Sequence, residues 1–261
     1  MTILDTIVEH KRMEVMKRKG RRSLDQVMAK DLYNREALHP KEYFSNNSPN
    51  IIAEFKRKSP SRGVLNSIVS PVPVVESYKA GGAGAVSILT DRDFFGGDFR
   101  DLEDSKKAVD EIPLLRKDFM IDSYQVYEAK AYGADIILLI ASILSKGEVS
   151  HLTGVANSLG LSVLLEVHEE EEIEKWIPEI AMIGVNNRDL KSFQTDINRS
   201  IDLLPKLPGE AIKISESGLQ NPGEVIQLFE AGYQGFLMGE RFMASDDPGK
   251  ALAEFITQLK K

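Results

Sequence analysis

The sequence contains no cysteine, which excludes disulfide bonds and thiolate metal sites. Its four histidines stand far apart, without the His-x-His or His-Glu-x-x-His spacing of a zinc site. No Gly-x-Gly-x-x-Gly follows a predicted strand, so a dinucleotide-binding fold is not indicated. No apolar run reaches the roughly 20 residues that cross a bilayer, and the N-terminus lacks the apolar centre of a signal peptide. We therefore expect a cytoplasmic protein that does not bind a membrane.

The sequence has fewer basic than acidic residues: 33 lysines and arginines against 40 aspartates and glutamates, which gives a formal net charge of −7. This balance argues against nucleic-acid binding by the whole molecule. One basic run, residues 11–22, departs from it, but the run contains Glu14 and no aromatic residue. We interpret the run as the solvated face of a helix, with a local nucleic-acid patch as the minority alternative.

The pattern of apolar residues predicts one α/β domain. Residues 2–18 have the pattern of an amphipathic helix, with Leu4, Ile7 and Val8 on one face, and residues 23–48 that of short helices and loop. From residue 50 onward, short apolar strands alternate with helix-like segments. Predicted strands lie near 50–56, 84–89, 112–116, 135–140, 162–166, 181–186, 211–215 and 235–238; predicted helices lie near 72–80, 101–109, 122–132, 146–159, 169–176, 198–204, 221–231 and 248–259.

Eight strand-then-helix units favour a closed (β/α)8 TIM barrel over an open doubly wound sheet. The strands are apolar on both faces, as parallel strands covered by helices are, and residues 136–140 are the clearest example. We therefore predict a barrel over residues 49–261, preceded by a helical extension over residues 1–48, as one structural domain overall.

Polar residues recur where the predicted strands end. Side chains alternate along a strand, so Glu54 and Lys56 share a face with Ile52. Active sites of TIM barrels lie at the carboxyl ends of their strands. If the equivalent faces point inward, one mouth collects two lysines, three carboxylates, an asparagine and an arginine: Lys56, Lys117, Glu54, Glu166, Glu216, Asn186 and Arg188.

The loops after the last two predicted strands suggest a phosphate site. Ser217-Gly218 follows one strand, and Gly239-Glu240 follows the other, ahead of a short helix-like piece at 241–243. These loops form the usual phosphate cradle of such barrels, because glycine permits close backbone approach and helix-start N–H groups point at the anion. Lys56 and Ser59 are placed to reach the same anion from the first strand.

Each residue also has an ordinary interpretation. A single charged residue after a strand is usually a solvated loop residue: Lys117 then pairs only with Asp118, and Glu166 only caps a helix. Six strand ends of the same kind together favour one polar site. Phe95 and Phe119, in or near rim loops, belong to the core or line an apolar ring pocket.

Residues 54–61, Glu-Phe-Lys-Arg-Lys-Ser-Pro-Ser, resemble the signature of the indole-3-glycerol-phosphate synthase family of tryptophan biosynthesis. The resemblance covers essentially the whole chain and is to the monofunctional form; it also implies that the N-terminal extension lies on the mouth side of the barrel. The matching stretches are residues 89–91, 115–119, 165–168, 184–190 and 215–218.

The resemblance implies a carbon–carbon lyase, a carboxy-lyase acting on 1-(2-carboxyphenylamino)-1-deoxyribulose 5-phosphate. The enzyme would join the aryl carbon that bears the carboxylate to the C2 carbonyl, lose CO2 and eliminate water. No metal or organic cofactor is expected, the small phosphosugar is the expected partner, and the oligomeric state stays open.

Under this resemblance Lys117 is the expected acid for ring closure, with Glu166 and Lys56 in later proton transfers; the reverse order of the two lysines stays open. We expect nearby cations and burial to lower the pKa of Lys117, and burial to raise that of Glu166. Glu54 would hold Lys56, and Arg188 would face the substrate carboxylate. Candidate catalytic residues are thus Lys117, Glu166, Lys56, Glu54, Asn186 and Glu216; substrate-binding residues are Ser59, Phe95, Phe119, Arg188 and Ser217; phosphate-binding residues are Lys56, Ser217, Gly218, Gly239 and Glu240.

Two rival functions stay in view. Phosphoribosylanthranilate isomerase needs an acid/base pair without decarboxylation, and the two lysines, Lys56 and Lys117, favour the synthase. A noncatalytic phosphosugar-binding protein is disfavoured because Lys56, Lys117 and Glu166 are all present.

Overall fold

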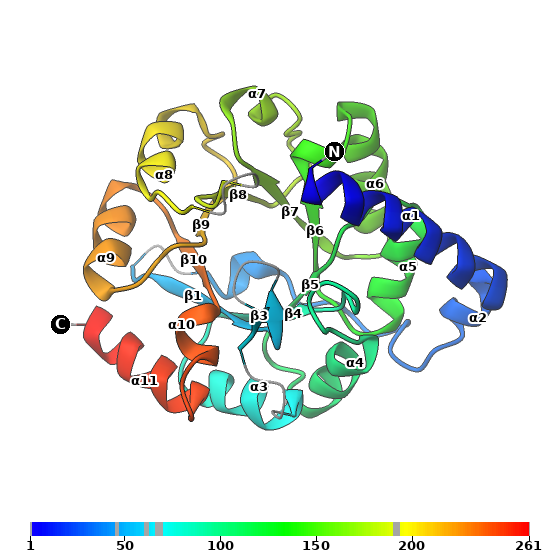
Figure 1. Cartoon of the computed structure of the whole chain (residues 1–261), viewed down its shortest axis with the longest axis horizontal. Helices are drawn as coiled ribbons and strands as arrows, with labels where there is room; N and C mark the ends of the chain where they lie inside the picture. The colour runs from blue at the N-terminus through cyan, green and yellow to red at the C-terminus, as the bar shows by residue number, and fades with distance from the viewer. Residues whose placement is uncertain (1, 45–46, 60–62, 66–69, 190–193, 261) are drawn as a thin grey trace.

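The computed structural model describes residues 2–44, 47–59, 63–65, 70–189 and 194–260. Within them, eight parallel strands close into a barrel whose order is β1-β10-β9-β8-β7-β6-β5-β4, with helices around it (Figure 1). The predicted TIM barrel is confirmed. Its strands are β1 (Asn50–Phe55), β4 (Ala85–Leu89), β5 (Leu114–Lys117), β6 (Ile136–Ile140), β7 (Ser162–Val167), β8 (Met182–Asn186), β9 (Ile212–Glu216) and β10 (Gly235–Met238).

A small antiparallel pair, β2 (Lys58–Ser59) and β3 (Gly63–Val64), follows β1. Pro60, Ser61 and Leu190, which belong to the family-like motifs, lie outside the described residues.

The helices begin at side-chain caps that the sequence supplies. Asp98, Asp122, Ser145 and Asn221 each form a capping box at the start of a helix. The helices are α3 (Pro71–Ala80), α4 (Phe99–Ala108), α5 (Ser123–Ala131), α6 (Lys146–Ser158), α7 (Glu170–Ile173), α8 (Asn198–Leu203), α9 (Pro222–Ala231), α10 (Glu240–Met243) and α11 (Pro248–Leu259), with 3-10 turns η1 (Pro40–Glu42), η2 (Ala141–Ile143) and η3 (Leu204–Lys206).

One predicted helix is shorter than expected. The pattern at residues 169–176 gives only the single turn of α7. Glu170 and Glu174 would stand four residues apart as like charges on a continued helix, and Pro178 follows closely, so the segment gains little from extending.

Strand parity places the apolar residues as predicted. Ile52, Leu115 and Leu164 pack together inside the barrel, whereas Ile51 and Phe55 pack in the layer between the strands and the helices. Glu54, Lys117 and Glu166 share the parity of the first group, so their side chains emerge at the top of the interior.

The N-terminal segment runs down the outside of the barrel. Helices α1 (Ile3–Arg21) and α2 (Leu24–Met28) lie alongside α5, as Figure 1 shows for α1 in dark blue. Arg35 Nη1 then lies 2.7 Å from Asp135 Oδ1, just before β6 begins. Phe44 ends the segment and packs inside the barrel floor against Ile52 and Ile214. The segment therefore spans the barrel from its upper rim to its floor.

The prediction that residues 11–22 form a solvated helix face is wrong at Lys11, whose side chain is fully buried. Its Nζ lies 2.8 Å from Asp91 Oδ2 and 2.9 Å from Asp118 Oδ1. Arg18 also pairs with Glu128 of α5, at 3.0 Å. These acidic partners are distant in sequence, so the local pattern carried no sign of them.

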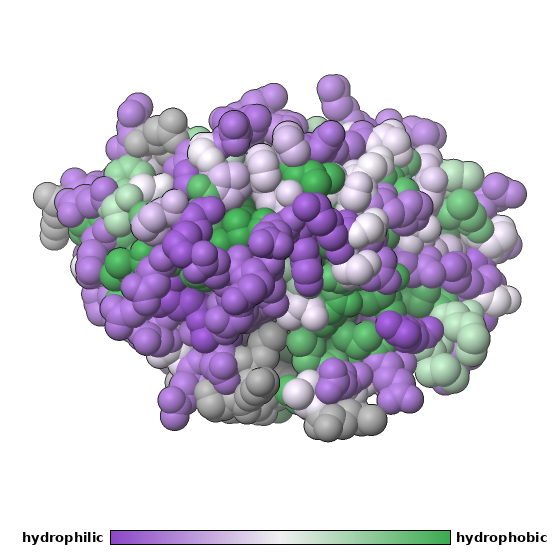
Figure 2. All heavy atoms as spheres, turned by 90° about the horizontal axis from the view of Figure 1, so that it is seen from above, coloured by the Kyte–Doolittle hydropathy of each residue, from purple (hydrophilic) through white to green (hydrophobic). Residues whose placement is uncertain are grey.

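Polar and charged residues dominate the face shown in Figure 2, with apolar atoms in smaller patches between them. Among the described helices, none is both long and apolar enough to cross a membrane.

Candidate active site

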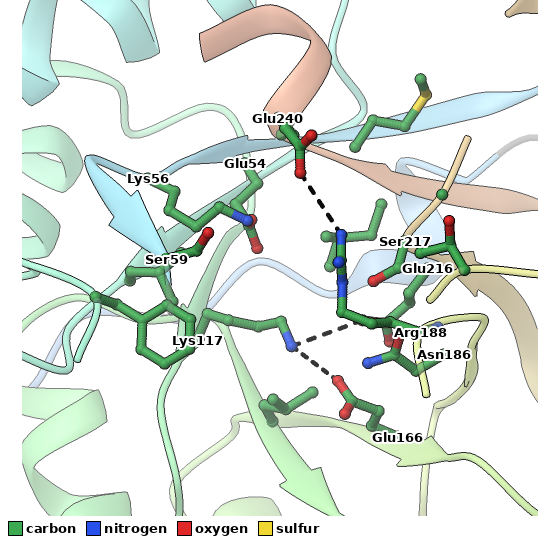
Figure 3. A pocket seen from close by; sticks show the side chains of 18 of the residues that line it. Glu54, Lys56, Ser59, Lys117, Glu166, Asn186, Arg188, Glu216, Ser217 and Glu240 are labelled. Atoms are coloured by element: carbon green, nitrogen blue, oxygen red, sulfur yellow. Dashed lines mark hydrogen bonds and ion pairs between the residues drawn. The ribbon is translucent and has the colours of Figure 1, made fainter. Parts of the chain in front are cut away.

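All predicted site residues line one cavity of about 560 Å³ at the carboxyl ends of the strands. They come from seven of the barrel strands or the loops after them, and Figure 3 shows the labelled ones around a common centre. The set is Glu54, Lys56, Ser59, Phe95, Lys117, Phe119, Glu166, Asn186, Arg188, Glu216, Ser217, Gly218, Gly239 and Glu240. Their proximity is a structural finding, whereas their chemical roles stay predictions.

Lys117 lies between the acidic residues of the cavity. Its Nζ lies 2.8 Å from Glu166 Oε2 and 3.7 Å from Glu216 Oε2, so one ammonium joins the ends of β5, β7 and β9 (Figure 3). Asp118 instead pairs with Arg116 and Lys11, which removes the alternative that Lys117 pairs only with its neighbour.

The expected lowering of the Lys117 pKa is wrong in sign. Burial alone would lower the pKa of Lys117, but the charges of Glu166, Glu216 and Glu54 outweigh burial and raise it. The charges that dominate its surroundings are carboxylates rather than the ammonium of Lys56. Lys117 is therefore charged throughout the neutral range.

The two carboxyls beside Lys117 differ in proton affinity. Burial raises the pKa of Glu216 to about 8, only partly opposed by Lys117. Burial also favours the neutral form of Glu166, but the charges of Lys117 and His168 and hydrogen bonds from Lys117 and Asn186 lower its pKa overall. The expected rise for Glu166 is thus wrong, and Glu216 is the carboxyl that holds a proton near neutrality.

Glycine makes room for Glu216. A Cβ added at Gly184 would lie 2.2 Å from Glu216 Oε1, so β8 needs glycine opposite this side chain. That oxygen has no hydrogen-bond partner among the described residues. Glu216 therefore has one buried oxygen beside Gly184 that no donor among the described residues satisfies.

Glu54 and Lys56 form the expected pair at the end of β1. Lys56 Nζ donates to Glu54 Oε1 at 2.6 Å, and the two side chains are 17% and 6% exposed. Lys56 is partly exposed and lines the cavity. A ligand in the cavity can therefore contact the Lys56 ammonium while its ion pair with Glu54 stays intact.

The loops after β9 and β10 have the tight geometry expected of an anion site. Ser217 has φ 66° and Gly218 φ 79°, two successive residues in the left-handed region. A serine held there stores roughly 1–3 kcal/mol of strain, which is typical of functional turns. A Cβ at Gly239 would lie 2.7 Å from Glu54 Cβ, so only glycine fits between β10 and β1.

Arg188 and the aromatic residues of the rim loops also line the cavity. Arg188 Nη2 lies 3.6 Å from Glu240 Oε2, and its backbone N–H donates to Asn186 Oδ1 at 3.0 Å. The ring centroids of Phe95 and Phe119 are 5.9 Å apart, a spacing at which the two rings pack against each other.

Some lining residues were not predicted. Ile3, Leu4 and Ile7 of α1 line the cavity, so the extension reaches the mouth, as the family resemblance implied. The apolar face of this helix was visible in the sequence, but what it covers was not. The alternation of side chains along the strands would have found three more lining residues, Leu138, Ile140 and Leu237. No local sequence pattern marks the polar ones, Asp118, Gln194, Thr195, Gln220 and Arg241. The lining is completed by Leu89, Leu219 and Met238.

Comparisons with known proteins match nearly the whole chain to one family. A family model described as "Indole-3-glycerol phosphate synthase" matches residues 4–255. A relative of that name from Bacteroides thetaiotaomicron is 43% identical over 258 residues, covering 99% of each chain. Another, from Polaromonas sp., is 40% identical over 261 residues, covering 97% of each chain.

Solved structures resemble the fold. A chain of the tryptophan synthase complex from Pyrococcus furiosus aligns with TM-score 0.61 at 13% identity, over 83% of this chain and 99% of that one. The 3-hexulose-6-phosphate synthase from Salmonella typhimurium aligns with TM-score 0.62 at 10% identity, over 81% and 99%. At such identities the likeness shows the barrel fold alone.

Proposed function

The chain belongs to the indole-3-glycerol phosphate synthase family, a carboxy-lyase family of tryptophan biosynthesis, and we propose how its own residues divide that reaction. The substrate is the phosphosugar 1-(2-carboxyphenylamino)-1-deoxyribulose 5-phosphate. The observation that carries the proposal is the Lys117 ammonium, held at 2.8 Å by Glu166 inside a cavity that also reaches the strained Ser217-Gly218 turn.

Lys117 acts first. When the aryl carbon attacks C2, negative charge develops on the carbonyl oxygen, and a fixed ammonium both stabilises that charge and donates a proton. The raised pKa of Lys117 favours the stabilisation of that charge, because the residue is fully charged before the step, although it makes the ammonium a weaker proton donor. Loss of CO2 then restores the aromatic ring.

Dehydration follows with a separate acid and base. The hydroxyl on C2 leaves as water with a proton from Lys56, and Glu166 removes a proton from C1. The lowered pKa of Glu166 suits a base, which is ionised at neutral pH. Glu216, which keeps its proton, orients the sugar hydroxyls by hydrogen bonding, together with Asn186.

Binding groups lie on either side of this centre. We assign the substrate phosphate to Ser217, Gly218, Gly239 and the amide of Glu240, with Lys56 nearby. The aryl ring packs on the Phe95–Phe119 pair, Arg188 faces the substrate carboxylate, and Ser59 completes the contacts from β2. Soaked sulfate is expected beside Gly218 and Gly239, and sulfate found only elsewhere counts against the phosphate assignment.

Formation of the indole product is followed by fluorescence after adding the substrate to the purified chain. Product at a rate comparable to related synthases supports the proposal; a folded chain that binds the substrate without product contradicts it. The division at residues 48 and 49 and the cytoplasmic location stay predictions from the sequence.

A further inference from the structure

Lys11 of α1 carries a buried ammonium that lies among carboxylates from three parts of the chain. Its Nζ lies 2.8 Å from Asp91 Oδ2 and 2.9 Å from Asp118 Oδ1, and these two aspartates follow β4 and β5. Glu14, one turn further along α1, lies 2.7 Å away. The described residues that line the cavity do not include Lys11. An effect of Lys11 on the reaction must therefore pass through its partners.

The two aspartates also hold the backbone of the aromatic residues at the rim. Asp91 Oδ1 accepts hydrogen bonds from the N–H groups of Phe94, at 2.8 Å, and Phe95, at 3.3 Å. Asp118 Oδ1 accepts one from the N–H group of Phe119, at 2.8 Å. Phe95 and Phe119 are the two rings that pack against each other and line the cavity. One carboxylate therefore separates the Lys11 ammonium from the backbone of each ring.

Helix α1 contacts the loop after β4 a second time. His10 Nε2 lies 3.1 Å from Asp93 Oδ2, and the His10 ring packs edge-on against Phe94 at 5.4 Å. The side chains of His10 and Asp93 are 42% and 59% exposed, so solvent screens this contact. Ile7 stands four residues before Lys11, on the same face of the helix, and lines the cavity. The buried contact of Lys11 is thus the stronger of the two that join this cavity-lining helix to the loop.

We propose that Lys11 positions the Phe95–Phe119 pair for the aryl ring of the substrate, by holding Asp91 and Asp118 at a fixed separation. Lys11 is buried outside the cavity and acts through these aspartates, so it is a positioning residue. The inference rests on the proposed function, in which the aryl ring packs on this pair.

Loss of the Lys11 ammonium should weaken the binding of the aryl ring. Without the ammonium the two aspartates repel each other, and the backbone segments that they hold separate. Only a fraction of the molecules then has both rings in place at one time. A ligand that needs both rings binds with an apparent affinity reduced by that fraction, whereas a ligand that needs neither ring binds as before.

The test compares ligands that contain the aryl ring with one that lacks it. Lys11→Met should raise KM for the substrate about tenfold and leave kcat within about threefold, because saturating substrate selects the molecules with both rings in place. The competitive inhibition constant of 2-aminobenzoate, the aryl part of the substrate, should rise by a similar factor. The inhibition constant of inorganic phosphate should stay within about twofold, because its proposed site lies after β9 and β10.

Two further variants separate positioning from stability. Asp91→Asn keeps an oxygen that can accept from the rim N–H groups but loses the charge that faces Lys11, so it should raise KM in the same way by a smaller factor. Glu14→Gln is the matched control, because it removes a carboxylate beside Lys11 whose other partner is Arg18 of the same helix. Its KM should equal that of the unmodified chain. Circular dichroism gives the folded fraction of each variant.

Three results would overturn the inference. The first is an unchanged KM in folded Lys11→Met, and the second is an equal rise in the inhibition constants of 2-aminobenzoate and inorganic phosphate, which would mean a general loss of the site. The third is the same KM in Asp91→Asn and Glu14→Gln, and this pair decides the matter if Lys11→Met does not fold. Absence of product from the unmodified chain would contradict the proposed function instead.

Discussion

Two buried lysines, Lys11 and Lys117, occupy similar surroundings with different consequences. Each ammonium lies within 4 Å of two carboxylates on the barrel, Asp91 and Asp118 for Lys11, Glu166 and Glu216 for Lys117. In both, the charges of the carboxylates outweigh burial and raise the lysine pKa. The Lys11 side chain is 0% exposed, whereas that of Lys117 is 16% exposed and lines the cavity.

The difference lies in what else the carboxylates bind. Asp118 also accepts from Arg116 and from the Thr90 hydroxyl, and its pKa is lowered because these partners and Lys11 overcome its burial. Within the part of the chain that the structure describes, Glu216 Oε1 has no hydrogen-bond donor, and burial raises the pKa of this residue. The Lys11 cluster is thus closed off from solvent and its Asp118 meets further donors, whereas the Lys117 cluster, to which we assign the chemistry, opens on the cavity.

Removing the ammonium of the closed cluster should have the largest effect. Lys11→Met leaves Asp91 and Asp118 buried without their shared cation, which should lower the free energy of unfolding by about 3–5 kcal/mol. Urea unfolding measures this change. Arg12→Met, an exposed change one position along the same helix, is the control. Equal stability of the two variants would show that the closed cluster does not hold α1.

Substitutions in the cluster around Lys117 should lower the catalytic rate more than the stability. Lys117→Met is expected to lower kcat at least ~10²-fold, about 2.7 kcal/mol in the barrier, because the acid for ring closure is lost. Glu166→Gln should lower it by a similar factor. Indole fluorescence gives kcat, and urea unfolding should show a smaller stability loss than in Lys11→Met. A near-normal rate would remove either residue from its assigned role.

The pH dependence of stability tests the raised pKa of Glu216 in the cluster around Lys117. Its folded-state pKa of about 8 lies above its ordinary value of 4.5, so the folded chain binds the extra proton and loses stability as pH rises between these values. Glu216→Gln cannot ionise and should escape that loss. For each pH unit between these two values the variant should gain on the order of 1 kcal/mol relative to the unmodified chain. Parallel stability curves would contradict the raised pKa.

The smallest effect should come from the exposed edge of the closed cluster. Glu14 is 26% exposed and lies 2.7 Å from Lys11, so solvent screens this pair. Glu14→Gln should change the free energy of unfolding by at most about 1 kcal/mol and leave kcat unchanged. A loss as large as that of Lys11→Met would mean that the cluster depends on all three carboxylates.

The sequence predicted where the site residues lie better than it predicted their pKa shifts. Period-two alternation alone put Lys117 and Glu166 on the inner face, and the structure confirms it. The pKa shifts were wrong because they depend on which charges meet across the barrel, and that is set by closure rather than by neighbours in the chain. The burial of Lys11 was missed for the same reason, since Asp91 and Asp118 come from two later strand ends.

Both clusters take residues from one short stretch. In β5 and directly after it, Arg116 and Asp118 point outward to α1 and the helices, and Lys117 points inward. The strand is held in register by pairing Leu89 with Lys117 and Leu115 with Ile136. A slip of one residue would turn the side chains of Arg116 and Asp118 toward the cavity and that of Lys117 toward α1. The alignment of β5 therefore decides which charged groups meet in the cavity and which hold α1.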